Sequence, residues 1–554
     1  MNPYNKLQPN WTLYSIFAAI GIVIYIVIQV LPATAQSFFE SDTGGQIIEK
    51  SDAQQAADDF VRSHFDLQPL GTHAVHQSDS LLYGYLSKEE LFDRYDRDYD
   101  QAFPTDTFQV NTVMPDDSML FIYVHMETGK VVSWNWGEAS YAAVPGTKEQ
   151  LEAAIAFAKE QGFKEADLDV HKHNALNGTV WLKPKGAAIG EAELMLEIRS
   201  QQIDDGSIVI TKYKPAFIAP KDYEHYVDQQ STLAMWLSYG GYLFLTFVLF
   251  VLAVIYAILY RKHTSFVRGI LLTLIFLGFY AVNNFNMIDG ILAGSGEDTI
   301  ADEGAIIAIT LIITTIFTFL LAVSVYFSLV GGDGLWRSTG RTLWPRFREA
   351  GYGDHVWRSM WLGYLAAFML LGLQTVIFII WTSMTGAWAT SDVTQSPYNL
   401  SIPWLLPLLA WCAAISEEAI YRLFGIGLMK KWFKNTFVAA LIPTVIWALG
   451  HVTYPIFPAT TRLVELTILG LIFSFLFLRY GFITAVFTHA IFNSVMMAIS
   501  LMFMGSLGNI LWGIFYILLP IPIAWLIRLW DNRAARNRPQ PLSPSLDKDP
   551  NPAT

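Results

Sequence analysis

Ten stretches of roughly 20 apolar residues limit the fold of this 554-residue chain more than any other feature of its sequence. A helix needs about 20 residues to cross a hydrocarbon core about 30 Å thick, and it satisfies its own backbone hydrogen bonds within lipid. Only 15% of the residues are charged, compared with about 25% in soluble domains. The sequence therefore predicts a polytopic α-helical membrane protein with about ten spans, near residues 11–32, 233–259, 267–288, 305–329, 359–384, 403–429, 436–454, 462–480, 482–503 and 507–529.

The loops between these spans differ in charge, which predicts their orientation. If the helices cross alternately, one set of loops holds almost all of the cations: Arg261, Lys262, Arg268, Arg337, Arg341, Arg346, Arg348, Arg358, Lys430, Lys431, Lys434, Arg479, Arg528, Arg533, Arg536 and Arg538. The opposite loops hold acids, with Arg462 as the lone cation: Glu297, Asp298, Asp302, Glu303 and Asp392. Both termini are therefore predicted to be cytoplasmic, and residues 36–230 are predicted to lie outside the cell membrane.

Five segments are expected along the chain. They are an N-terminal membrane anchor (1–35), an extracytoplasmic domain (36–230), a first group of membrane helices (231–358), a second group with the final span (359–530) and a disordered cytoplasmic tail (531–554). The first span ends in Pro32-Ala33-Thr34-Ala35, which resembles a signal-peptidase site. Its flank offers only Lys6, and its apolar stretch is long for a signal peptide. An uncleaved anchor is therefore expected.

Acidic residues are concentrated in the extracytoplasmic segment. Residues 36–230 contain 33 acidic and 16 basic residues, a net charge of −17, whereas the rest of the chain has 15 acidic and 20 basic residues, a net charge of +5. Because no basic surface is clustered, no nucleic-acid partner is predicted; the partner that the composition predicts is the lipid bilayer. The single cysteine, Cys412, excludes an intrachain disulfide and a cysteine-based metal site.

The extracytoplasmic segment repeats one plan. A helical stretch (53–65) precedes strands 119–126 and 131–136, and a second helical stretch (148–163) precedes strands 193–199 and 207–213. Polar turn residues inside each strand pair predict two β-hairpins. An α+β domain in two copies is expected, and the order of elements resembles the PepSY-like domains of bacterial envelope and peptidase-associated proteins. The resemblance implies binding or regulation, with an unknown ligand of the outer domain.

Two adjacent carboxylates, Glu417 and Glu418, lie near the middle of the apolar stretch 403–429. Each charge at that depth costs at least a few kcal/mol. Glu418 and Arg422 are four residues apart, so they share a helix face and can neutralise one another. Glu417 projects about 100° away and lacks that partner. A buried pair that only pins helices together would not need a second glutamate, so Glu417 is a candidate functional residue.

Two further apolar stretches supply groups with matching chemistry. His451 lies in the stretch 436–454, and His489 and Asn493 face the same way from the stretch 482–503. A lone histidine between membrane helices is often only a hydrogen-bonded contact, but four such groups within about 80 residues indicate a site. A carboxylate can activate water as a base, and a histidine and an asparagine can donate hydrogen bonds to an oxyanion. Peptide hydrolysis by this set requires no serine or cysteine nucleophile.

The combination Glu417-Glu418-x-x-x-Arg422, His451 and His489-x-x-x-Asn493 resembles the CPBP family, the CAAX proteases and bacteriocin-processing enzymes that are also called the Abi family. The resemblance covers roughly residues 359–503. It implies an intramembrane endopeptidase acting on a peptide or membrane-protein substrate, with Glu417 as general base and His451 helping to bind the attacking water. It also implies that His489 and Asn493 form the oxyanion hole and that Glu418 and Arg422 are an orienting pair.

The sequence departs from this family pattern at two positions. Trp447 stands where phenylalanine is usual, and Leu423 stands where glycine is often found. We expect these departures to affect substrate fit more than activity. Zinc is possible, because family members are commonly described as metalloproteases, and its ligands are unknown. No His-Glu-x-x-His motif is present, and the Ras-processing branch resembles a glutamate-dependent protease, so no cofactor is expected.

Other classes of function remain open. One is a non-catalytic membrane receptor or bacteriocin-immunity scaffold, and another is a transporter, because intramembrane acids and histidines also relay protons. For a bacterial chain, bacteriocin maturation, self-immunity or envelope signalling is expected rather than cleavage of prenylated CAAX ends. With straight spans, His451 would lie near the outer end of its helix and His489 in the inner half of its own, which opposes a shared site. Tilted or shortened helices around a cavity would remove that conflict.

Overall fold

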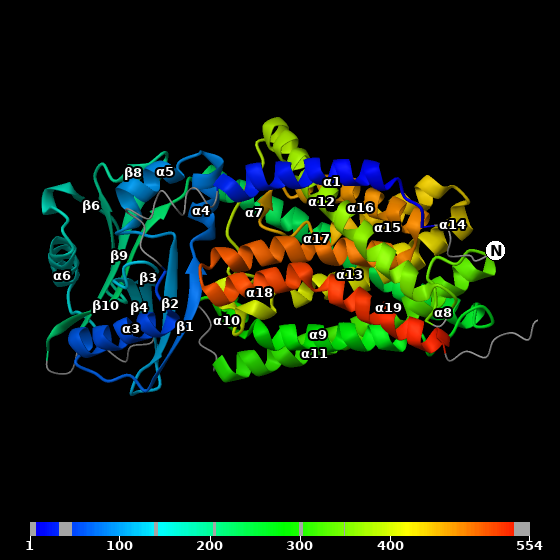
Figure 1. The fold of residues 1–554 in the computed structure, drawn as a ribbon. Coiled ribbons are helices and arrows are strands. Elements are labelled where there is room, and N and C mark those ends of the chain that lie inside the picture. Colours follow the sequence, from blue (N-terminus) through cyan, green and yellow to red (C-terminus); the bar gives the residue numbers. More distant parts are fainter. Residues whose placement is uncertain are drawn as a thin grey trace, which may run out of the picture.

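The computed structural model describes residues 7–32, 47–137, 142–202, 206–297, 303–347 and 349–536. A sheet domain stands at one end of an elongated helical body (Figure 1). The start of α1 (Trp11–Tyr25) and the end of α19 (Pro520–Arg536) both lie at the other end of that body. Residues 33–35 at the end of the first predicted span and residues 537–554 of the predicted tail lie outside the described part of the chain.

The sheet domain contains one antiparallel sheet built from two similar halves. In each half a helix precedes four strands, and the strand order β1-β2-β3-β4-β10-β9-β7-β6 joins the halves edge to edge through β4 and β10. Short strands β5 (Ala142–Ala143) and β8 (Ala188–Ile189) pair with β9. The long strands are β1 (Gly71–Ser78), β2 (Asp106–Val113), β3 (Met119–His125), β4 (Val131–Trp136), β6 (Leu168–Asn174), β7 (Thr179–Pro184), β9 (Ala192–Gln202) and β10 (Ile208–Ile218).

Both predicted hairpins are present, as β3–β4 and β9–β10. The two helices, α3 (Lys50–Phe65) and α6 (Thr147–Glu160), follow the predicted stretches closely. The halves form a single sheet, which the sequence did not indicate. The likeness to PepSY domains stays a prediction, because only the order of helix and strands bears on it.

The register of the sheet separates an apolar face from a polar face. Trp134 on β4 lies opposite Ile122 and Tyr213 on the neighbouring strands, and its ring contacts Phe60 of α3 and Phe157 of α6. Both helices therefore cover the same face. Side chains one position along each strand point to the other face, which consequently carries the polar residues and is turned away from α3 and α6.

Within the described residues, six helices are long and apolar enough to cross a membrane, or up to eight if each of two bent helix pairs is one span. The six are α1 with η1 (Trp11–Val30), α7 with η5 and α8 (Lys221–Leu259), α11 (Gly304–Ser338 within Glu303–Ser338), α12 (Tyr352–Thr385), α16 (Thr460–Tyr480) and α17 (Phe482–Phe503). The bent pairs are α9–α10 (Ile270–Asn286 and Ile288–Ser295, 49°) and α18–α19 (Leu507–Leu518 and Pro520–Ala534, 41°).

Two of the ten predicted spans do not meet this test. The stretch 403–429 forms α13 (Leu408–Glu417), η8 (Glu418–Ile426) and α14 (Gly427–Phe433), and Glu417, Glu418 and Arg422 place three charges inside it. The stretch 436–454 forms only α15 (Thr436–Leu449), whose 14 residues span about 21 Å. Both segments pack in the interior of the body, so ten complete crossings are not established.

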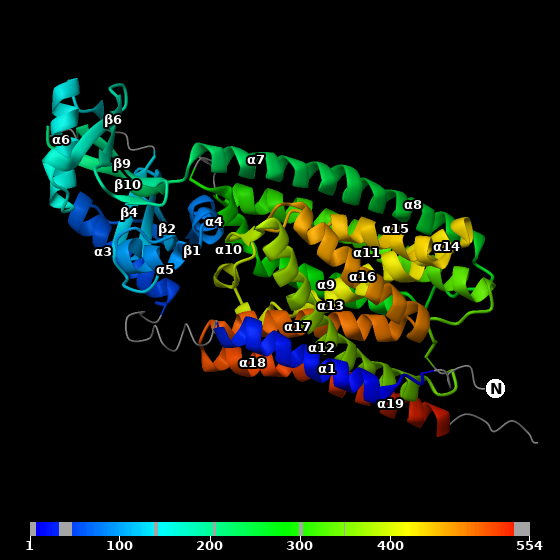
Figure 2. The same cartoon turned by 90° about the horizontal axis from the view of Figure 1, so that it is seen from above.

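The basic loops lie together at the end of the body away from the sheet domain (Figure 2). Arg346 Nη2 donates to the His263 carbonyl at 3.3 Å, and Arg341 Nη2 donates to the Leu478 carbonyl at 2.9 Å. The loop between α11 and α12 therefore contacts both the loop between α8 and α9 and the end of α16. That this end is cytoplasmic stays a prediction.

The sheet domain is held against the helical body by residues of β1 and by Lys50 at the start of α3. Gln77 Nε2 donates to the Ala293 carbonyl of α10 at 3.0 Å, and His76 exchanges two backbone hydrogen bonds with the Asn399 side chain at 2.7 and 2.8 Å. Lys50 Nζ and His73 Nε2 both contact Asp289 of α10, at 2.6 and 3.0 Å. The chain itself also connects the sheet domain to the helical body. The helix α7 follows the last strand of the sheet and continues into α8 of the body.

Candidate active site

Glu417 and Glu418 lie where the helix that begins as α13 widens into η8, a segment with i→i+5 hydrogen bonding. Such π-helical turns are frequent at functional sites. Glu418 and Arg422 are both fully buried, and Arg422 Nη1 lies 3.2 Å from Glu418 Oε1. The Glu417 side chain is 22% exposed. Glu418 is therefore buried in an ion pair with Arg422, whereas the neighbouring Glu417 remains accessible to solvent.

His489 of α17 stands between the two carboxylates. Its Nδ1 lies 2.8 Å from Glu418 Oε1, and its Nε2 lies 3.7 Å from Glu417 Oε2. Nδ1 is therefore hydrogen-bonded to Glu418, whereas Nε2 is too far from Glu417 for a direct hydrogen bond. Phe473 of α16 lies against the His489 ring, with centroids 4.9 Å apart. The ring is thus fixed by packing on one face and by a hydrogen bond at one nitrogen.

Trp447 of α15 links the glutamates to His451. Its indole Nε1 donates a hydrogen bond to Glu417 Oε2, and the Arg422 guanidinium lies over its ring at 4.3 Å. The His451 ring lies 5.2 Å from the Trp447 ring, and its Nδ1 lies 3.0 Å from the Trp447 carbonyl oxygen. Trp447 therefore contacts the accessible carboxylate as well as the orienting pair.

The predicted conflict of depth between His451 and His489 is resolved by the length of α15. That helix contains Pro443 and ends at Leu449, so His451 lies just beyond it rather than at the end of a full crossing. The Trp447 ring lies 6.1 Å from the His489 ring and 5.2 Å from the His451 ring. Both histidines consequently stand around the same indole.

Asn493 is the predicted site residue with the fewest ties to the others. It follows His489 by one helical turn and is partly buried. Within the described residues its side chain makes no hydrogen bond to the other five. The structure thus brings five of the six residues into one connected group and leaves Asn493 beside it.

All six residues fall inside a segment with known relatives. Residues 399–495 match the family model described as type II CAAX prenyl endopeptidase Rce1-like. These residues form an Rce1-like domain. The family is one of proteases, and the predicted likeness to the CPBP, or Abi, proteases is confirmed. The Rce1-like domain covers α13 to most of α17, and the sheet domain and the first membrane helices lie outside it.

A curated relative matches a similar length of chain. The sporulation-killing factor biosynthesis protein SkfC of Bacillus subtilis (strain 168) is 30% identical over 89 residues, which are 16% of this chain and 18% of SkfC. The match therefore spans less than a fifth of that relative. No solved structure matches the chain.

Sequence reasoning missed the aromatic residues that surround the Rce1-like site. Trp447 was expected to affect substrate fit more than activity, but its indole contacts Glu417 directly. Tyr454 lies 5.4 Å from the His451 ring, and Tyr242 and Tyr280, from helices outside the domain, are close enough to interact electrostatically with Glu417. Aromatic residues are common in apolar helices, so only the departure at Trp447 distinguished any of them in the sequence.

The residues of the Rce1-like site do not fit a metal ion well. In the described part of the chain, no three histidine, cysteine, aspartate or glutamate side chains are arranged to hold one. His489 Nδ1 and Arg422 both interact with Glu418, so this carboxylate is already paired. Glu417 Oε2 accepts a hydrogen bond from the Trp447 indole N–H. Tetrahedral zinc needs three or four converging protein ligands, so no catalytic step is assigned to a metal.

Proposed function

We propose that the Rce1-like domain is an intramembrane endopeptidase that hydrolyses a peptide or membrane-protein substrate with a water activated by Glu417. One observation supports this most directly. Glu417 Oε2 and His489 Nε2 face each other at 3.7 Å, while Glu418 and Arg422 hold His489 from behind. This arrangement supports a base that can activate water next to a donor for the oxyanion that forms.

The two ring nitrogens of His489 have separate roles in this proposal. Nδ1–H donates to Glu418 Oε1 at 2.8 Å, which fixes the ring. Nε2–H faces Glu417 Oε2 at 3.7 Å and is available to the reaction.

The proposed reaction then follows from the groups present. Glu417 takes a proton from water as the water oxygen bonds to the scissile carbonyl carbon. His489 Nε2–H, with the Asn493 amide, donates to the oxyanion that forms, and His451 holds the attacking water. The carbon–nitrogen bond breaks as Glu417 passes its proton to the leaving amine. Asn493 needs to approach only once substrate is bound, which accounts for the absence, within the described residues, of a hydrogen bond from its side chain to the other five.

The aromatic surroundings strengthen these interactions. Trp447 and Phe473 cover Arg422 and His489 and exclude water from their far side. Hydrogen bonds to developing charge are stronger where water is excluded. We assign Glu418 and Arg422 a positioning role, because both are buried behind His489 and neither faces the accessible carboxylate.

We propose that the substrate is a bacteriocin-like precursor or an envelope protein. The name of SkfC places that relative in the biosynthesis of a killing factor, which agrees with peptide maturation. The family description names prenylated CAAX ends, and that substrate class is the alternative. Incubating the protein in liposomes with a prenylated and an unprenylated form of one peptide separates the two: equal cleavage supports the first class, and cleavage of the prenylated form alone supports the second.

The assignment as a protease is tested by variants at Glu417. The N- and C-termini of the membrane proteins are compared between membranes that contain the wild type and membranes that contain Glu417→Ala. New termini produced by cleavage should be present only with the wild type. A non-catalytic receptor or a transporter predicts identical sets of ends. Flux across reconstituted vesicles that depends on Glu417 would favour the transporter.

A further inference from the structure

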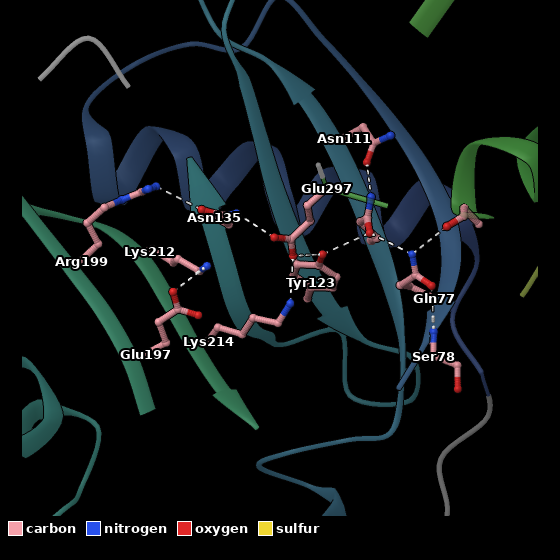
Figure 3. A network of polar contacts seen from close by, with 12 residues as sticks. Gln77, Ser78, Asn111, Tyr123, Asn135, Glu197, Arg199, Lys212, Lys214 and Glu297 are labelled. Atoms are coloured by element: carbon pink, nitrogen blue, oxygen red, sulfur yellow. Dashed lines mark hydrogen bonds and ion pairs between the residues drawn. The ribbon is translucent and has the colours of Figure 1, made fainter. Parts of the chain in front are cut away.

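The polar face of the sheet holds a carboxylate that belongs to the helical body. Glu297, just beyond α10, accepts hydrogen bonds from the Tyr123 hydroxyl of β3 and from Asn135 Nδ2 of β4, the latter at 2.7 Å. Lys214 Nζ of β10 lies 3.3 Å from Glu297 Oε1. Figure 3 shows the glutamate reaching over three adjacent strands, each of which supplies one donor.

These donors form a built site rather than a chance surface contact. Tyr123 and Asn135 are buried, and the Glu297 side chain is only 14% exposed. Arg199 Nη2 donates to Asn135 Oδ1 at 3.0 Å, which turns the amide nitrogen of Asn135 towards the carboxylate. The donors on the three strands, together with Arg199 that orients one of them, therefore form a preorganised site for one carboxylate group.

The charge of the face also favours an anion. Arg199, Lys212 and Lys214 point to it, and the β9 carboxylates on the same face are each paired with a lysine: Glu197 with Lys212 at 2.9 Å and Glu193 with Lys183 at 2.6 Å. Burial disfavours ionised Glu297, but Lys214 and the hydrogen bonds from Tyr123 and Asn135 outweigh that cost and hold its pKa below the usual value. Because the domain as a whole is strongly acidic, this local excess of cations is a specific feature.

A cavity of about 460 Å³ adjoins the carboxylate site. Tyr123, Lys214 and Glu297 form part of its wall, and its other walls combine amide and hydroxyl groups with aromatic rings, including Gln77, Gln109, Thr107, Phe103 and Phe217. Asp79 also lines the cavity, and its carboxylate accepts a hydrogen bond from the backbone N–H of Leu82 at 3.0 Å. Its volume lies within the range of ligand pockets and is far larger than a single ion needs. Such a lining suits peptide backbone groups next to apolar side chains.

We propose that this cavity binds a short acidic peptide segment whose carboxylate takes the place of Glu297 against Tyr123, Asn135 and Lys214. Glu297 then acts as an intramolecular competitor, and ligand binding releases one contact between the sheet domain and the helical body. The proposal does not depend on proteolysis, because it concerns a site far from Glu417.

The test uses the full chain in lipid nanodiscs and calorimetric titration with acetyl-Ala-Glu-Ala-amide. Glu297→Gln should bind this peptide about tenfold more tightly than the wild type, because the tethered carboxylate no longer competes. Adding Lys214→Met to that variant should remove the gain. The peptide acetyl-Ala-Gln-Ala-amide should bind weakly to every variant, since it lacks the charge.

Asp289→Asn is the matched control, since it breaks a second contact between domain and body, with Lys50 at 2.6 Å, outside the cavity. It should leave peptide affinity unchanged. Equal tightening by Asp289→Asn and Glu297→Gln, equal binding of the glutamine peptide, or displacement by the same concentration of inorganic phosphate would overturn the proposal. If Glu297→Gln fails to fold, weaker binding by Lys214→Met than by the wild type supports it, and unchanged binding contradicts it.

Discussion

Nδ1 of His489 lies 2.8 Å from Oε1 of Glu418, a fully buried carboxylate that also contacts Arg422. This relationship divides the two adjacent glutamates by role. Glu418 fixes the orientation of a histidine, and Glu417, on the other side of the ring, is left to face the accessible side of the site.

Arg422→Met should destabilise the protein strongly. Removing one partner of a buried ion pair costs about 3–5 kcal/mol, because the other charge stays buried, so the free energy of unfolding should fall by that amount and cleavage should be lost. The double variant Glu418→Gln/Arg422→Met should regain much of the stability without regaining activity. Denaturant titration in detergent measures both effects; a single variant as stable as the wild type would show that the pair is not structural.

Trp447→Phe should lower cleavage while the protein stays folded. The phenyl ring preserves most of the packing against Arg422, but the hydrogen bond from Nε1 to Glu417 is lost. A hydrogen bond to a charged acceptor is worth about 1.5–3 kcal/mol, so kcat should fall about ten- to hundredfold.

Trp411 offers a matched control for that variant. It lies on α13, the helix that ends at Glu417, and its buried Nε1 makes no hydrogen bond to any of the described residues. Trp411→Phe should therefore leave kcat nearly unchanged. If both substitutions reduce kcat equally, ring packing rather than the bond to Glu417 explains the loss.

The contact between Glu297 and the sheet should weaken only in acid. Its pKa in the folded protein lies below the usual value because of Lys214, Tyr123 and Asn135. Ionised Glu297 therefore stabilises the fold above its usual pKa, and this contribution is lost as the pH falls through the lowered pKa. Calorimetry of the wild type and Glu297→Gln should give a difference in Tm that is constant near neutral pH and disappears in strong acid. A difference that grows on acidification would contradict this sign.

Proteolysis should not require zinc. No three suitable ligands converge in the described part of the chain, and Trp447 already occupies the oxygen of Glu417 that faces His489. Cleavage by protein treated with a chelator should match that of untreated protein. Complete loss of activity that is restored by zinc would instead establish a metalloprotease.

The site was largely predictable because charged groups in apolar helices stand out. Glu417, Glu418, Arg422 and His489 meet as their spacing indicated, since each is costly in lipid unless it is paired. Trp447 was underestimated because an indole is unremarkable in such a helix, and its N–H finds Glu417 only through the packing of α15 against η8.

The sheet domain was predictable only in its local parts. The hairpins β3–β4 and β9–β10 are encoded by alternation and turns, and both are present. The edge-to-edge pairing of β4 with β10 joins residues far apart in the chain, as does the bond between Tyr123 and Glu297. No periodicity specifies such pairings. Ten spans are not established, because hydropathy does not distinguish a short buried helix such as α15 from a full crossing.

The most direct test of proteolysis by Glu417 and His489 is to identify the new N- and C-termini of membrane proteins that cleavage produces. Four membranes are compared, which contain the wild type, Glu417→Ala, His489→Ala or Ser416→Ala. Ser416 is the matched control, because it neighbours Glu417 but bonds back to the Cys412 carbonyl at 2.8 Å. The account predicts one set of cleavage products with the wild type and Ser416→Ala, and its absence with Glu417→Ala and His489→Ala. The same products in all four samples would contradict it.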